Sequence, residues 1–337
     1  MLESMSIGIV ILVAFAITVF LIPKYIKRAK AIDLVGKDMN KYDKPEIAEA
    51  GGVVVLFGFL FAILCYIFIK TFFLGTEMHL IEILVISVTI LLAGFIGFVD
   101  DIFGWKKGLK RWQKPLFTLP MAIPLMVINA GQSYMFLPFL GRVDFGLLFP
   151  LIIIPLGFIG ATNGFNMLAG YNGIEAGMGA IILATMGFIA WYFNGMIWLA
   201  MVSFVGVAAL LGFLAFNWCP AKVFPGDSLT YMIGAFIASV AIMGNMEKIG
   251  IILFLPFLLD AVLSLSPEVR GKGKVEAFGK VNPDNSLDMP YDGVYDTTHL
   301  AIKVMKKLKS KVYEKDVTLF IYFLELIMVV LVFAFFI

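Results

Sequence analysis

The stretch "GFVDDIFGWKKGLKRWQKP", residues 97–115, places two adjacent carboxylates, Asp100 and Asp101, at the end of a long apolar run. Neighbouring residues on a helix point about 100° apart, so only one of the two acids can face a bound group squarely. Carboxylates near a helix C-terminus also interact unfavourably with the helix dipole, so ending the helix does not explain why two acids stand here. We therefore predict a catalytic role for this pair. Of the bases that follow, Lys114 directly precedes Pro115 and the next apolar run, where it could reach a phosphate.

A second polar stretch, "ATNGFNMLAGYNGIEAG", contains three candidate amides, Asn163, Asn166 and Asn172. The first two are three residues apart and share a face if they are helical. Amide oxygens are hard ligands that suit Mg²⁺, and an amide can also read the edge of a nucleobase. An Asn-Gly pair also forms turns without any ligand, and this alternative stays open for Asn172.

Two further motifs contain an aromatic residue, an acid and a set of bases. In "KVFPGDS", Phe224 precedes a Pro-Gly turn, and Asp227 fits a helix cap and a metal ligand equally well. Asp227 together with Asn166 would suit Mg²⁺, with Mn²⁺ as an alternative, because Mg²⁺ takes few protein ligands besides phosphate and water oxygens. In "PEVRGKGK", Arg270 lies in a Gly-rich loop that suits either anion capture or solvated surface charge.

The composition indicates which elements must position these residues. The chain of 337 residues is 61% hydrophobic and 15% charged, which is typical of a membrane protein and not of a soluble one. Its two cysteines have no spacing that suggests a disulfide framework or a zinc site. We predict an all-α polytopic protein with ten transmembrane helices, beginning near residues 6, 51, 80, 115, 146, 175, 197, 228, 248 and 317.

The basic residues predict the orientation of these helices. Ten helices leave the loops 24–50, 100–114, 163–174, 217–227 and 267–316 on one side. Those loops contain every Lys and Arg except Lys70, Arg142 and Lys248. The positive-inside rule therefore predicts that both termini lie outside and that cytoplasmic loops form the active site. We treat residues 1–337 as a single catalytic domain, in which the long loop 267–316 contains an amphipathic interfacial helix near 299–316.

The order of the motifs resembles one family. The DD pair near the third span, "NMLAGYNGIEAG" after the fifth and the GD pair opening the eighth are similar to the polyprenyl-phosphate N-acetylhexosamine-1-phosphate transferases, over essentially the whole chain. Bacterial members typically have a histidine-rich motif in the last loop. This chain has "PEVRGKGK" there, and in this respect it looks like the archaeal and eukaryotic UDP-GlcNAc:dolichyl-phosphate GlcNAc-1-phosphotransferase branch. The stretches "GKDMN" and "EIAEAGG" after the first span also look like that branch.

The resemblance implies a role for each candidate residue. It implies that Asp227 and Asn166 bind Mg²⁺, that Asn172 reads uracil and Phe224 stacks on it, and that Glu49 lies near the nucleotide. It further implies that Lys114 and Arg270 hold the diphosphate and that Asp100 or Asp101 serves the acceptor phosphate. Asn163 belongs to the same substrate-binding motif. Asp260 and Glu325, which are acids within apolar runs, receive no role.

The resemblance also implies the partners and the location. They are a UDP-N-acetylhexosamine, dolichyl or polyprenyl phosphate and the lipid bilayer, with no nucleic acid; whether the protein is a monomer or a homodimer stays open. The membrane would be the cell membrane in an archaeon or the endoplasmic reticulum in a eukaryote. Three alternatives are a bacterial-type undecaprenyl-phosphate transferase, a transporter or flippase, and an ordinary glycosyltransferase that acts on a lipid phosphate and releases UDP. A transporter should have internal repeats and its polar motifs near the midplane, whereas the polar motifs here gather at one interface and the sequence shows no repeat.

Overall fold

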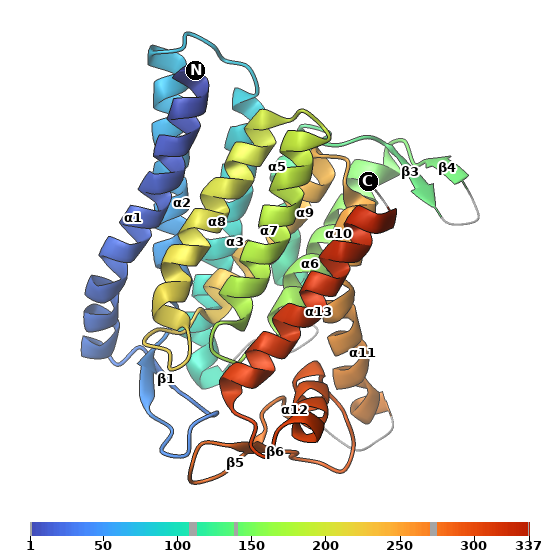
Figure 1. The fold of residues 1–337 in the computed structure, drawn as a ribbon. Coiled ribbons are helices and arrows are strands. Elements are labelled where there is room, and N and C mark those ends of the chain that lie inside the picture. Colours follow the sequence, from blue (N-terminus) through green and yellow to red (C-terminus); the bar gives the residue numbers. More distant parts are fainter. Residues whose placement is uncertain (1, 108–112, 138–140, 270–274, 336) are drawn as a thin grey trace.

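In the computed structural model the chain is a bundle of long helices (Figure 1). The structure describes residues 2–107, 113–137, 141–269, 275–335 and 337. The α-helices in this part of the chain are α1 Leu2–Ala31, α2 Gly52–Phe72, α3 Leu80–Lys107, α4 Gln113–Thr118, α5 Ile123–Val127, α6 Ile154–Met167, α7 Ile174–Tyr192, α8 Ile197–Asn217, α9 Gly226–Met243, α10 Glu247–Leu253, α11 Leu255–Val269, α12 Thr297–Leu308 and α13 Glu314–Phe335.

Three small antiparallel hairpins occur in the connections between the helices, where the sequence had suggested only loops. They are formed by β1 Val35–Lys37 with β2 Glu46–Ala48, β3 Tyr134–Leu137 with β4 Gly141–Asp144, and β5 Lys280–Val281 with β6 Leu287–Asp288. The protein is therefore mostly helical, as predicted.

Within the described residues, eight helices are long and apolar enough to cross a membrane, and the count rises to nine if α10 and α11 form one broken span. Those two helices are bent by 53°, and Pro256 at the break lacks the backbone N–H that a continuous helix needs. The fourth predicted span, beginning near residue 115, corresponds to Lys114–Val127, which is too short to pass the same test. Its three prolines interrupt the helical hydrogen bonds, which explains the division into α4, a short 3₁₀ turn and α5.

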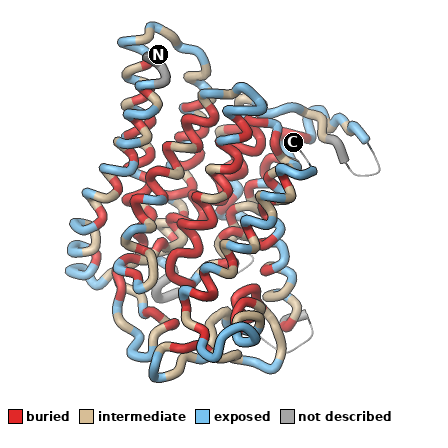
Figure 2. The backbone as a smooth tube through the Cα atoms, in the orientation of Figure 1, coloured by how far each residue is buried: buried red, intermediate tan, exposed pale blue. Residues whose placement is uncertain are grey.

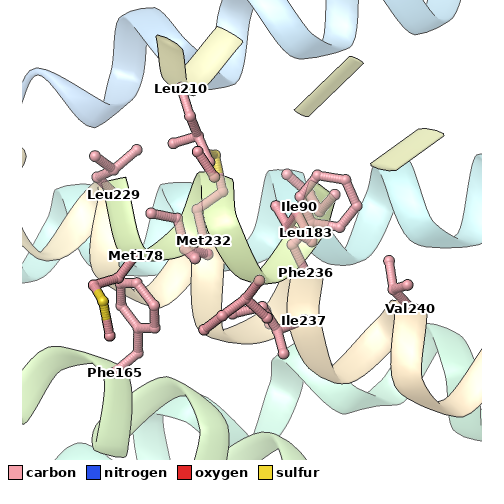
Figure 3. Close-up of a cluster of buried hydrophobic side chains, with 14 of the residues drawn as sticks. Ile90, Phe165, Met178, Leu183, Leu210, Leu229, Met232, Phe236, Ile237 and Val240 are labelled. Carbon is pink, nitrogen blue, oxygen red and sulfur yellow. The ribbon is translucent and has the colours of Figure 1, made fainter. Parts of the chain in front are cut away.

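Helix α9 forms the centre of the bundle, and its side chains from Ser228 to Met243 are buried. Figure 3 shows Met232 and Phe236 of α9 among apolar side chains that come from α3, α6, α7 and α8. Backbones approach closely here: a Cβ added to Gly97 of α3 would overlap the carbonyl oxygen of Asp227, and one added to Gly234 would lie 2.6 Å from the carbonyl oxygen of Ala161 in α6. These glycines therefore set the distances between the polar ends of α3, α6 and α9.

The outer faces of the bundle are apolar. Figure 2 shows exposed turns along the outer helices and buried turns through the middle. Leu12 of α1 and Val330 of α13 are 68% and 65% exposed. Large apolar side chains in such positions are compatible with lipid and not with water, so the chain is an integral multi-pass membrane protein.

The two ends of the bundle differ. Both termini lie at one end, whereas β1, β5, β6 and α12 lie at the opposite end (Figure 1). Helix α12 ends at Leu308, earlier than the expected 299–316, and its Ala301 and Ile302 are buried in the protein. Most of its apolar face therefore packs against protein, although Leu308 remains exposed.

Helix α3 continues to Lys107, so Asp100 and Asp101 are helical residues and do not end the helix as expected. Because the helix extends beyond the two acids, they do not lie in its last turn and are not strongly disfavoured by its dipole. A different reason for their presence is found in their partners.

Candidate functional site

A three-residue ion cluster joins α3, α4 and α9. Lys114 Nζ lies 3.0 Å from Asp100 Oδ2 and 2.9 Å from Asp227 Oδ2. Asp100 is 4% exposed, and it also accepts a hydrogen bond of 3.0 Å from the Tyr231 hydroxyl. One cation thus holds two carboxylates that come from separate helices, at the end of the bundle where the polar loops lie.

Asp101 binds the backbone of α9 and not Lys114. Its Oδ1 accepts the backbone N–H of Asp227 at 2.6 Å, and its Oδ2 accepts the backbone N–H of Ser228 at 3.1 Å. Both carboxylate oxygens therefore satisfy N–H groups in the first turn of α9, which have no partner within their own helix. The two neighbouring acids diverge as the 100° helical spacing predicted: Asp100 pairs with Lys114, while Asp101 caps α9.

A polar cavity of about 250 Å³ lies beside this cluster. It lies among the β1–β2 hairpin, the end of α6, the loop before α7 and the start of α9. Five of the predicted site residues line it: Glu49, Asn166, Asn172, Phe224 and Asp227. Residues separated by more than 170 positions in the sequence are thus brought to one cavity.

Asn166 and Asp227 offer two oxygen ligands on the same cavity wall. Thr230 connects them, because its hydroxyl donates to Asn166 Oδ1 at 3.0 Å and lies 3.3 Å from the carbonyl oxygen of Asp227. One amide oxygen and one carboxylate are a donor set that fits Mg²⁺, which usually takes one or two protein carboxylates and completes its shell with phosphate and water oxygens. Among the described residues no group of three His, Cys, Asp or Glu side chains could hold a metal ion.

Phe224 is fixed by backbone hydrogen bonds on both sides. Its N–H donates to the carbonyl oxygen of Ala48 at 2.7 Å, and its carbonyl oxygen accepts the N–H of Gly51 at 2.8 Å. The ring lines the cavity. A rigidly held aromatic ring in a polar cavity can stack on a flat ligand such as a nucleobase.

Glu49 lies near several other acids. Burial and the nearby charges of Asp101, Asp227 and Glu175 raise the pKa of the Glu49 carboxyl to about 8. Glu49 is therefore mostly protonated at neutral pH and can donate a hydrogen bond to a ligand. Gly36 lies against this carboxyl so closely that an added Cβ would overlap it.

Asn163, unlike Asn166 on the same helix, does not line the cavity. The amide of Asn163 donates to Thr118 Oγ1 at 3.1 Å and to the carbonyl oxygen of Ile159 at 2.9 Å, so it faces α4. Arg270 lies outside the described residues.

A buried acid–amide network behind the cavity was missed by the sequence reasoning. Asp38 and Glu314 both contact Asn172, and Lys41 pairs with both acids. "KDMN" was noted only as a family feature, and Glu314 stands among lysines, where an acid looks like ordinary surface charge. The one available signal was that Glu314 lies three residues before the start of the last apolar run.

The fold and the cavity together define a membrane-embedded enzyme with a polar site at one end of a helical bundle. Residues 83–245, which include α3 through α9, match glycosyl transferase family 4. The chain is 33% identical over 310 residues to a protein of Saccharolobus solfataricus named as a UDP-N-acetylglucosamine–dolichyl-phosphate N-acetylglucosaminephosphotransferase, covering 90% of each chain. It is 32% identical over 330 residues to a protein of the same name from Sulfolobus acidocaldarius, covering 96% of this chain and 94% of the other.

A bacterial relative is also similar. The phospho-N-acetylmuramoyl-pentapeptide-transferase of Halalkalibacterium halodurans is 30% identical over 287 residues, covering 81% of this chain and 86% of the other. The chain therefore belongs to glycosyl transferase family 4 and is a sugar-phosphate transferase, as the resemblance of its motifs had implied.

Proposed function

We propose that the protein transfers GlcNAc-1-phosphate, or a related N-acetylhexosamine-1-phosphate, from a UDP-sugar to dolichyl or polyprenyl phosphate. The products are a sugar-diphospho-lipid and UMP, and the reaction is the first step of lipid-linked oligosaccharide synthesis for N-glycosylation. The observation that carries the proposal is the placement of Phe224, Asn172, Asn166 and Asp227 around one cavity, directly beside the Asp100–Lys114–Asp227 cluster. A nucleotide base, a diphosphate and an attacking phosphate could be aligned there.

In the proposed reaction, a phosphate oxygen of the lipid attacks the sugar-bearing phosphorus, and the bond from that phosphorus to the UMP oxygen breaks. The second pKa of a phosphate monoester is near 6, so the acceptor is mostly a dianion at neutral pH and needs little help from a base. We therefore favour a single displacement without an aspartyl-phosphate intermediate. Asp100 would orient the acceptor through its contact with Lys114, or its carboxylate would itself accept a residual proton from the acceptor phosphate.

The protein has to supply alignment and neutralise charge in this reaction. Lys114 would neutralise phosphate charge by exchanging part of its contact with Asp100 and Asp227 for phosphate oxygens. Bound by Asn166 and Asp227, Mg²⁺ or Mn²⁺ would neutralise the charge that develops on the diphosphate.

An apolar groove is a candidate place for the lipid chain. A cavity of about 270 Å³ lies between α6, α9 and the α10–α11 pair, and apart from Glu247 its lining is nearly all apolar. Three of its lining residues, Leu156, Ile251 and Leu258, are about half exposed, so the groove can be reached from the outer face of the bundle. We propose that the prenyl chain lies here.

The positive residues support a cytoplasmic site. We propose that the broken α10–α11 pair and Lys114–Val127 complete a set of ten membrane segments, with both termini outside. UDP-sugars are cytosolic, which agrees with this orientation. The membrane would be the cell membrane in an archaeal host and the endoplasmic reticulum in a eukaryotic one.

The bacterial-type reaction is disfavoured because the histidine of the long final loop has a structural role. His299, which lies in the long final loop, is buried, and its Nε2 lies 3.1 Å from the carbonyl oxygen of Glu276. Burial also lowers the pKa of its imidazole, so it is held as a neutral structural residue. Among the described residues the cavity has no histidine in its lining.

The proposal is tested with membranes containing the protein, polyprenyl phosphate, Mg²⁺ and UDP-GlcNAc labelled separately in the uridine and in the sugar. We expect UMP release together with a labelled sugar-diphospho-lipid. The variant Asp227→Ala should lose turnover, whereas Asp144→Ala in the β3–β4 hairpin should keep it. Release of UDP, uptake of the sugar without chemistry, or activity only with a UDP-MurNAc-pentapeptide donor would refute the assignment.

A further inference from the structure

The orientation of the Asn172 amide is fixed by the protein itself. Asn172 Nδ2 lies 3.0 Å from Asp38 Oδ2 and 3.2 Å from Glu314 Oε2. Ionised carboxylate oxygens only accept hydrogen bonds, so the atom that faces both acids must be the amide NH₂ group. Both amide hydrogens are therefore used within the protein.

The two acids also have a cation and other hydrogen-bond donors as partners. Lys41 Nζ lies 3.5 Å from Asp38 Oδ2 and forms a close ion pair with Glu314. Asp38 Oδ1 also accepts the backbone N–H of Asn40 at 3.1 Å, and Glu314 Oε2 accepts from the Cys219 thiol at 3.2 Å. Asp38 and Glu314 are only 3% and 2% exposed, and such pairing offsets the cost of burying their carboxylates.

The first turn of α13 also fixes the backbone of Asn172. Glu314 Oε1 accepts the N–H of Asn172 at 2.8 Å, and the hydroxyl of Thr318 donates to its carbonyl oxygen at 3.1 Å. A rotation of the whole residue would break these bonds. The amide can thus flip only if the character of its two acid partners changes.

The remaining polar atom of the side chain is Oδ1. No group among the described residues donates to it, and Asn172 lines the cavity that Phe224 also lines. Towards a ligand, Asn172 is consequently an acceptor and not a donor. A base that presents an N–H here is accepted, whereas a base that presents a lone pair is repelled.

We propose that Asp38 and Glu314 are positioning residues that select uracil over cytosine, by locking Asn172 Oδ1 towards N3 of the base. Uracil has a hydrogen on N3, and cytosine has a lone pair at the same position. This inference rests on the proposed function, which supplies the uridine nucleotide as donor. It assigns the choice of base to two residues that contact Asn172, Asp38 in the cavity lining and Glu314 at the start of α13.

The test compares UMP and CMP binding to the purified full chain in detergent by titration calorimetry. The wild type should bind UMP at least about ten-fold more tightly than CMP, because a mismatched buried polar group typically costs that much or more. In Asp38→Asn/Glu314→Gln both partners become amides that donate as well as accept, so Asn172 can flip. The UMP/CMP ratio should then fall to about two-fold or less, with weaker UMP binding.

The control is Asp316→Asn, which lies in the same first turn of α13. Asp316 accepts from Lys309 and from the N–H of Tyr313 and does not contact Asn172, so its substitution loosens the turn but should leave the UMP/CMP ratio unchanged. If the double variant does not fold, Glu314→Gln alone is measured and should lower the ratio to a smaller extent.

The outcomes separate the inference from the proposed function. A wild-type protein that binds neither nucleotide refutes the proposed uridine donor. A wild type that prefers UMP, with an unchanged ratio in the Asp38 and Glu314 variants, refutes only the locking role. Equal binding of the two nucleotides by the wild type, or tighter CMP binding, also refutes that role.

Discussion

Replacing Asp101 with alanine should destabilise the protein by removing the cap of α9. The substitution deprives the N–H groups of Asp227 and Ser228 of their acceptor, and both lie in the first turn of a buried helix. This turn also presents Asp227 to Lys114. We therefore expect a loss of stability and a displaced Asp227 carboxylate from one substitution.

The magnitude follows from the two hydrogen bonds. Loss of a helix N-cap costs about 0.5–2 kcal/mol, and hydrogen bonds to a charged acceptor contribute about 1.5–3 kcal/mol each. These effects overlap, so we expect Asp101→Ala to lower the free energy of unfolding by about 2–4 kcal/mol. Asp101→Asn keeps one acceptor oxygen and should lose about half as much, because one of the two N–H groups keeps its partner.

The assay is unfolding of the purified variants in mixed detergent micelles, combined with UMP release from UDP-GlcNAc. Stability and activity should decline in the same order, from wild type through Asp101→Asn to Asp101→Ala. An Asp101→Ala protein with the stability of the wild type and no turnover would refute the capping role and would place this carboxylate on the substrate. Equal losses in the alanine and asparagine variants would also contradict the argument.

Three further predictions concern other parts of the site. Lys114→Gln removes the cation between two carboxylates and should lower kcat/KM for UMP release by about 10²–10³-fold. A decrease of less than about ten-fold in kcat/KM would contradict the proposed role of Lys114 in neutralising phosphate charge. The pKa of Glu49 is raised from 4.5 to about 8 on folding, so the folded protein loses stability as the pH rises through this range. The Tm of the wild type should therefore decline more than that of Glu49→Gln between about pH 5 and pH 9. Parallel curves of Tm against pH for the two proteins would refute this. Gly97→Ala forces α3 from the backbone of α9 and should cost about 1–3 kcal/mol, whereas Gly157→Ala, which meets no atom within 4 Å, should not lower Tm.

The sequence predicted the position of the site better than the partners of each residue. Apolar runs and positive loops were enough to place Glu49, Asn166, Asn172, Phe224 and Asp227 at one end of the bundle. Loops on one side of a membrane must meet at one surface, so this convergence follows from topology alone.

What the sequence could not predict depends on contacts between distant segments. Asp101 caps a helix that begins 125 positions later, and Glu314 binds an amide 142 positions earlier. Neither pairing leaves a local pattern. Asn163 shares the helical register of Asn166, yet it meets Thr118 of α4, because the neighbour on that side of α6 is known only from the packing.

The sequence could not predict which apolar runs form straight, full-length helices, for a similar reason. A hydropathy run measures apolar length, and Pro256 and the prolines of Lys114–Val127 change the path of the chain without changing that length. The helical segments were therefore found, while the bend and the short helix were not.

The contacts of α13 also have a consequence for how the protein is made. Glu314, Thr318 and Tyr322 hold the loop around Asn172 and Gly173, so the nucleotide cavity depends on a helix that the ribosome synthesises after all the other cavity residues. Until residues 314–322 have entered the membrane and docked, this loop lacks these three supports. A nascent chain would thus insert most of its helices while still unable to bind the donor, and transfer activity would begin only when the last helix is in place.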